Sequence, residues 1–231
     1  IMPNGIKSFI SESAYNNKKN QKHFKIFGTI DFFIKDPLPS NVDILKVKDF
    51  VEKKIPSVFT DRIDAFYVGH FQEFEDKQVN AMYKDGAVYV SNNQDDESDM
   101  EDDIIHEIAH AVESNFAMDI YSDNKIQNEF LGKRTRLRDM LSEYGWLDGK
   151  DISFMELEYS KEFDDFLHKE ITYSTLDMFC VGLFVRPYAA TDLREYFATA
   201  FEEYFLGDRP YVKRISPVAY QKIKSLHMGE V

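Results

Sequence analysis

The sequence predicts an α+β fold, and three observations lead to this prediction. Segments rich in β-branched and aromatic residues are confined to residues 29–90. Apolar residues at helical spacing dominate from residue 99 onward. Strands therefore come first and helices follow, unlike the alternating order of a parallel α/β protein. The 231 residues correspond to one or two domains, and 43% hydrophobic residues provide enough apolar surface for a core.

The first part of the chain is expected to contain a small sheet and one helix. Asp85-Gly86 between two apolar segments is a strong hairpin signal, because both residues tolerate the positive φ angles of a tight turn. Asp36-Pro37 ends the first strand, and Pro56 ends the helix. In chain order we expect a strand over 29–34, a helix over 42–55, and strands over 65–68, 79–83 and 87–90.

The second part is expected to be helical. Ser98 and Glu101 have the spacing of a capping box, which predicts a helix from about Asp99 to Phe116. Further helices are expected over 126–142, 155–183 and 192–205. We therefore expect a sheet-containing part over 28–98 and a helical part over 99–231, together forming a single domain.

The segment 1–27 differs in composition from the rest. Five lysines and one glutamate give residues 1–26 a net charge of +4, among Ser, Asn and Gln. The segment contains no apolar stretch of the kind found in secretory signals. We interpret it as a polar, basic leader or linker.

Composition excludes several classes of protein. A net charge of -13 and a pI near 4.9 argue against nucleic-acid binding, which requires clustered Lys and Arg. No apolar run approaches the roughly 18 residues of a membrane-spanning helix. The one cysteine, Cys180, excludes a disulfide framework and a cysteine-based zinc ribbon, and its apolar surroundings predict a buried side chain.

The motif His106-Glu107-Ile108-Ala109-His110 is the strongest functional signal. Residues four apart lie on the same face of a helix, so both imidazoles can reach one Zn²⁺ ion. Glu107 is then placed to accept a proton from a water molecule on the metal. The apolar residues of this segment fall on the opposite side, which predicts a packed face: Ile104, Ile105, Ile108 and Val112.

A third protein ligand is needed to define the class of metal site. Glu113 and Phe116 stand where the metzincin motif requires Gly and His, which excludes that class. His168 is one candidate, but its charged surroundings are typical of a solvated helix histidine. Glu195, in a helix of aromatic and small residues, is favoured. For Glu202 and Glu203 we expect a solvated position or an indirect role beside the metal ligands.

Two segments together resemble a known family. The first is His106–Val112, and the second contains Tyr188–Thr191 and Glu195–Phe201. Both resemble the catalytic domain of anthrax lethal factor and its relatives, which are gluzincin-type zinc endopeptidases and include the Pro-Pro endopeptidases. The resemblance implies a zincin-like fold with a small N-terminal sheet and helix packed on a mainly helical C-terminal part. It implies one catalytic Zn²⁺ ion bound by His106, His110 and Glu195, with Glu107 as general base and Tyr188 assisting at the transition state.

The resemblance covers about 104–117 and 186–206, and the chain departs from the family in three ways. Thr199 stands where lethal factor has a second glutamate, and Ala109 stands where glycine is frequent. The stretch between His110 and Glu195 is also longer, which indicates an insertion at about 125–183. We expect this insertion to form a helical lobe, a partner surface or a larger core.

These features predict an endopeptidase acting on a peptide or protein substrate. We expect the strand containing Ala87, Val88, Tyr89 and Val90 to form the edge of the sheet, where an extended peptide can add as a further strand. Seven carboxylates within residues 95–103 supply negative charge at the start of the metal helix, and they would also attract basic peptides.

The alternative is a structural or interaction module that keeps a zinc-protease fold inside a larger assembly such as a phage particle. It rests on the insertion and on residues 7–12, which resemble leaders of tailed-phage structural proteins. Family members are often secreted, so the family also allows a toxin domain. The sequence specifies neither the compartment nor the oligomeric state.

Overall fold

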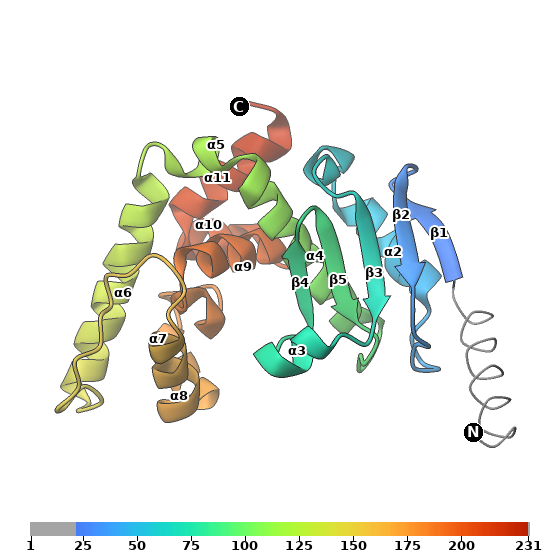
Figure 1. Cartoon of the computed structure of the whole chain (residues 1–231). Helices are drawn as coiled ribbons and strands as arrows, with labels where there is room; N and C mark the ends of the chain where they lie inside the picture. The colour runs from blue at the N-terminus through green and yellow to red at the C-terminus, as the bar shows by residue number, and fades with distance from the viewer. Residues whose placement is uncertain (1–21, 231) are drawn as a thin grey trace, which may run out of the picture. The chain divides into compact units, whose positions relative to one another are not determined.

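The computed structural model describes residues 22–230, which divide into two compact units with their boundary in the chain between Ala111 and Val112. The first unit contains the strands and the second is helical, so the expected α+β class is confirmed (Figure 1). The expected leader lies outside the described residues up to residue 21. No helix within 22–230 has the length and apolar character needed to cross a bilayer.

The first unit is built on a mixed sheet, which has five strands within the described residues (Figure 1). The strand order is β1-β2-β3-β5-β4; β2, β3 and β5 are parallel, and the two outer strands are antiparallel to their neighbours. The strands are β1 (Lys22–Ile26), β2 (Ile30–Ile34), β3 (Ala65–Gly69), β4 (Ala81–Lys84) and β5 (Ala87–Ser91).

The two faces of the sheet carry different side chains. On one face, Phe32, Phe66 and Val88 are register partners and are fully buried. On the other face, Phe33, Tyr67 and Tyr89 form a half-buried ladder with ring centroids 5.2 Å apart. Because side chains alternate along a strand, this division follows from the register of the three parallel strands.

The predicted hairpin is confirmed between β4 and β5. Asp85 and Gly86 have φ angles of 51° and 80°, as a type I′ turn requires. A Cβ atom at Gly86 would lie 2.7 Å from Asp64 Oδ2, so glycine is also required sterically. The turn fixes the register in which β4 pairs with β5.

Two expectations about the sheet are wrong. The leader was expected to extend to residue 27, but Lys22–Ile26 forms β1, a charged edge strand that buries only Ile26 completely. The strand Ala87–Ser91 is not the sheet edge, because it pairs with β3 on one side and β4 on the other. An uncharged, buried strand is typical of a sheet interior, whereas β4 ends in Lys84 and forms the edge.

Helices complete the first unit. The helix α2 (Ile44–Lys54) buries Ile44, Val47 and Val51, and Asp43 caps it by accepting from Leu45 N at 3.0 Å. Two short elements, η1 (Ser57–Thr60) and α3 (Gln72–Lys77), lie in the connections before and after β3. The last helix, α4 (Glu97–Asn115), begins in this unit, and its last turn belongs to the second.

The start of α4 differs from the predicted capping box. Asp96, rather than Ser98, provides the cap: its Oδ1 accepts from Asp99 N at 3.1 Å. Asp99 Oδ2 in turn accepts from Asp95 N at 3.1 Å. The helix therefore starts two residues before the predicted position, and part of the acidic segment caps it.

The second unit consists of helices and connecting segments, with no strand among its described residues. The helices α6, α9 and α11 contact one another, and α10 contacts α9 and α11. Within this unit Cys180 is buried and free, as predicted, and burial raises its pKa to about 12. The elements are α5 (Ala117–Tyr121), α6 (Lys125–Glu143), α7 (Lys161–Asp165), η2 (Phe166–Glu170), α8 (Tyr173–Cys180), η3 (Pro187–Ala190), α9 (Leu193–Leu206), α10 (Arg209–Ile215) and α11 (Pro217–Met228).

The expected continuous helix over 155–183 is wrong. The segment contains α7, one turn of π-helix in η2, and α8. Thr172, with a φ angle of 69°, separates the π-turn from α8. Positive φ at a β-branched residue ends the helical path, so the apolar periodicity is spread over three short elements.

Candidate metal centre

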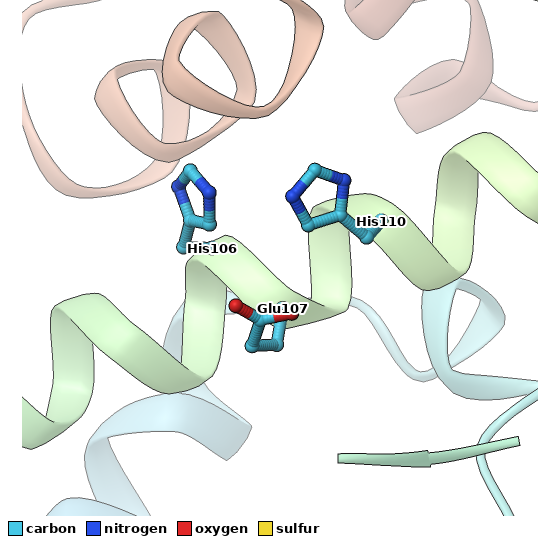
Figure 2. A group of neighbouring side chains, drawn as sticks. All are labelled: His106, Glu107 and His110. Atoms are coloured by element: carbon cyan, nitrogen blue, oxygen red, sulfur yellow. The ribbon is translucent and has the colours of Figure 1, made fainter. Parts of the chain in front are cut away.

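The helix α4 carries the HExxH motif in the middle of a well-packed stretch. Ile104, Ile105 and Ile108 are fully buried, which confirms the predicted packed face. With this face fixed in the core, the rotation of the helix and the direction of the histidine side chains are also fixed. Figure 2 shows both imidazoles projecting from one side of α4, while Glu107 points to another side.

His106, Glu107 and His110 form a group that can hold a metal ion. One potential ligand atom from each residue lies within 4.8 Å of the others. The two imidazole centroids are 5.0 Å apart, and the rings are inclined by 79°. His110 and Glu107 are buried, at 8% and 7% exposure, and His106 is half-buried. Two imidazoles and a carboxylate are nitrogen and oxygen donors of the kind that zinc prefers, so these residues fit the expected ion.

The carboxylate of Glu107 is bound by the sheet. Tyr83 N, on β4, donates a hydrogen bond to Glu107 Oε2 at 2.5 Å. The side chain of Tyr83 is held separately, through a bond from its hydroxyl to Arg62 O at 3.1 Å. The sequence did not predict the hydrogen bond from Tyr83 N to Glu107, because any residue type other than proline can donate through its main-chain N–H.

A second carboxylate lies one turn before His106. Burial raises the pKa of Asp103 to about 6, a hydrogen bond from Gln94 Nε2 at 3.0 Å opposes this, and Asp99 and Glu107 raise it further. His106 lowers the same pKa. The sequence grouped Asp103 with the acidic segment, and in the structure it is half-buried and accepts from the buried Gln94 side chain.

Glu195, the expected third ligand, lies in the first turn of α9 in the second unit. Asp192 caps this helix, and its Oδ1 accepts from Arg194 N and Glu195 N at 2.9 Å each. Arg194 Nε binds Glu113 Oε2 at 2.9 Å, and Tyr121 donates to the other oxygen of Glu113 at 2.9 Å. The start of α9 is therefore held by an N-cap and by an ion pair in which Glu113 is buried and Arg194 is exposed.

Tyr188 belongs to η3, seven residues before Glu195. Burial raises the pKa of its hydroxyl above the ordinary value, and the charges of Glu195, Asp164 and Asp192 raise it further. The phenol therefore remains protonated through the neutral pH range and can donate a hydrogen bond. The side chain is 37% exposed, so a ligand can reach it.

His168 is more buried than the sequence interpretation expected, with a side chain that is 18% exposed. Its Nε2 lies 3.1 Å from Thr191 Oγ1, and its ring centroid lies 5.7 Å from that of Tyr188. Burial lowers the pKa of this histidine, and the nearby Asp164 opposes the shift. The structure therefore places His168 as a packed neighbour of Tyr188 within the second unit.

The remaining expected residues have clear positions. Glu202 is buried, at 3% exposure, and both Glu202 and Glu203 bind Arg186, so a solvated position is wrong for Glu202. Thr199 Oγ1 donates to Glu195 O at 2.8 Å, which satisfies the hydroxyl inside α9. A cavity of about 1010 Å³ in the first unit lies beside residues 37–46 and is not lined by the two motif histidines.

Comparison of the chain with protein-family models, curated proteins and solved structures gives no match. The candidate site is described by its own geometry: a helix-borne pair of histidines with an adjacent buried carboxylate, a group that could hold a metal ion.

Proposed function

We propose that the chain is a zinc-dependent endopeptidase, and the group of His106, Glu107 and His110 is the observation that carries the proposal. Histidines four residues apart on a packed helix, with a glutamate beside the first, have the spacing needed for metal-assisted hydrolysis. When bound, a zinc ion lowers the pKa of its water to about 7, which supplies a nucleophile near neutral pH.

The residues of the chain then handle the protons. Glu107 accepts a proton from the attacking water and returns it to the leaving amine. The hydroxyl of Tyr188 donates a hydrogen bond to the oxyanion at the scissile carbonyl, and its raised pKa supports this role. We propose Glu195 as the third protein ligand on the basis of the resemblance of its helix, and the capped start of α9, where Asp192 accepts from Glu195 N, supports the assignment.

We propose that the substrate is an extended peptide segment. The outer side of β4 supports this, since every second residue of the strand directs its main-chain groups away from β5, and those not bonded to Glu107 can pair with an added strand. This moves the expected binding edge from residues 87–90 to β4. The carboxylates at the start of α4 favour basic peptides, and the resulting attraction should weaken as salt is added.

The experiment that tests the function compares the wild-type chain with Glu107→Gln. Zinc content is measured by elemental analysis, and cleavage of a mixed peptide library is followed with and without a chelator. We expect zinc-dependent cleavage by the wild type, and loss of at least about 10³-fold in the variant with its zinc retained. Cleavage that persists in Glu107→Gln contradicts the mechanism. Zinc binding without cleavage by the wild type supports a structural module instead.

A further inference from the structure

The strand β4 presents its main-chain groups alternately to β5 and to the outside. Ser91 N donates to Asn80 O at 2.7 Å, and the register pairs Met82 with Tyr89 and Lys84 with Ala87. Hydrogen-bonded and non-hydrogen-bonded pairs alternate along an antiparallel ladder. The main-chain N–H and C=O groups therefore face β5 at Asn80, Met82 and Lys84. The main-chain N–H of Tyr83 faces away from β5.

The acceptor for this outward N–H comes from a helix. Tyr83 N donates to Glu107 Oε2 at 2.5 Å, and the Glu107 side chain is 7% exposed. A buried carboxylate needs such donors, because water cannot solvate it fully. A main-chain donor in a paired strand cannot rotate to another partner, so it restricts the carboxylate more strongly than a surface side chain would.

We infer that the main-chain N–H of Tyr83 is the positioning group for the general base Glu107. By holding Oε2, the edge strand sets the orientation of the carboxylate relative to the two imidazoles on α4. The inference rests on the proposed function for the role of Glu107. It also means that a peptide paired with β4 bonds mainly through the other outward main-chain groups of the strand.

The contact is tested first without metal, by hydrogen exchange of the ¹⁵N-labelled chain. We expect the Tyr83 amide to be protected although it faces away from β5, and to exchange at least tenfold faster in Glu107→Ala. The Met82 amide, which faces β5, is the internal control and should keep its exchange rate. If Glu107→Ala does not fold, the wild type still decides, because an unprotected Tyr83 amide beside a protected Met82 amide overturns the inference. An unchanged Tyr83 rate in folded Glu107→Ala also overturns it.

The positioning role is tested by replacing the main-chain N–H of Tyr83 with an ester oxygen. Suppression of a stop codon at position 83 with the α-hydroxy analogue of tyrosine converts the amide to an ester, which keeps the side chain and removes only the N–H. Suppression with tyrosine itself is the matched control. We expect kcat per bound zinc to fall at least tenfold, with KM and zinc content within twofold of the control. An unchanged kcat overturns the inference, since a purely structural contact would alter stability and leave turnover per folded molecule intact.

The hydrogen-exchange and kinetic experiments distinguish failure of this inference from failure of the proposed function on which it rests. If the wild type binds zinc but cleaves no peptide, the proposed function fails, and the positioning role fails with it even where exchange confirms the contact. If the wild type cleaves peptides but the Tyr83 amide is unprotected, the function stands and only the inference falls.

Discussion

Arg194 Nε lies 2.9 Å from Glu113 Oε2, and this ion pair joins the first turn of α9 to the last turn of α4 within the second unit. The Glu113 side chain is 7% exposed, whereas that of Arg194 is 52% exposed. The buried partner therefore determines the cost of breaking the pair, because its carboxylate cannot return to water without opening the structure.

Replacing Arg194 should destabilise the fold through Glu113. Arg194→Met removes the Arg194 cation from the buried carboxylate and keeps the bond from the Tyr121 hydroxyl, and we expect a loss of about 2 kcal/mol in the free energy of unfolding. Adding Glu113→Gln should recover part of this loss. Urea denaturation of the metal-free protein measures both.

An exposed arginine provides the control for this pair. Arg138 binds the adjacent Asp139 on the surface of α6, and Arg138→Met should cost less than about 0.5 kcal/mol. If Arg138→Met and Arg194→Met had equal effects, the burial of Glu113 would have no influence on stability.

Metal removal should lower stability in a manner that depends on the histidines. Free zinc at a thousand times its Kd should stabilise the native state by about 4 kcal/mol, because the unfolded chain does not hold the ligands together. Thermal unfolding with zinc and with a chelator measures the difference. His110→Ala should lose the response, and Glu107→Gln should keep it. A zinc response retained in His110→Ala would exclude His110 as a ligand.

The expected third ligand can be assigned by affinity. Glu195→Gln should weaken zinc binding by about 100-fold or more, since even outer partners of metal ligands contribute 10- to 100-fold. Glu203→Gln, on the same helix, is the matched control, because Glu203 binds Arg186 and Asp208 N. Competition with a chromogenic chelator gives the two affinities. Equal affinity of Glu195→Gln and wild type would move the third ligand elsewhere.

The role of Tyr188 should appear in turnover rather than in binding. Tyr188→Phe removes one donor to the oxyanion, for which we expect kcat to fall by roughly 10²-fold while KM changes little. Tyr173→Phe is the control, since the Tyr173 ring also neighbours His168 but has no proposed catalytic role. Steady-state kinetics on a peptide found in the library screen decide between them. A change in KM alone would make Tyr188 a substrate-binding residue.

The sequence correctly predicted those features whose geometry is determined by a few neighbouring residues. The turn at Asp85-Gly86 has the positive φ angles that the dipeptide indicated, and the isoleucines of α4 are buried as expected. The helix α9 begins within two residues of its predicted start because Asp192 caps it. In each case a few adjacent residues specify the geometry, so sequence is sufficient.

Features that depend on distant partners were not predictable in this way. The order of the strands depends on parallel pairing of β3 with β2 and β5, and either arm of the hairpin could have been the outer one. Arg134 is fully buried with its guanidinium 3.7 Å from the ring centroid of Phe163, although a charged residue in a helix usually predicts an exposed position. The bond from Tyr83 to Glu107 likewise depends on tertiary packing.

The acidic segment at the start of α4 should make stability fall as pH rises. Burial raises the pKa of Glu101 to about 7, and the nearby carboxylates of Asp102, Glu97 and Asp96 raise it further, while Lys54 lowers it. Between pH 4.5 and 7 the native state therefore holds a proton that the unfolded chain has released. Stability is then greatest at the acidic end of this range and declines toward pH 7.

Glu101→Gln should remove this decline. The variant should be more stable than the wild type by about 1 kcal/mol at pH 8, a value reduced for the solvent exposure of the side chain, and equally stable at pH 4. Urea denaturation of the metal-free proteins at pH 4, 6 and 8 measures the difference, and Glu158→Gln removes the same charge at an exposed position as a control. A gain of the same size at pH 4 and pH 8 would mean that packing, rather than charge, limits stability at this position. If Glu158→Gln were stabilised as much as Glu101→Gln at pH 8, the cause would be the lower net charge of the whole chain, because both variants lose one negative charge. A local cause stabilises Glu101→Gln alone.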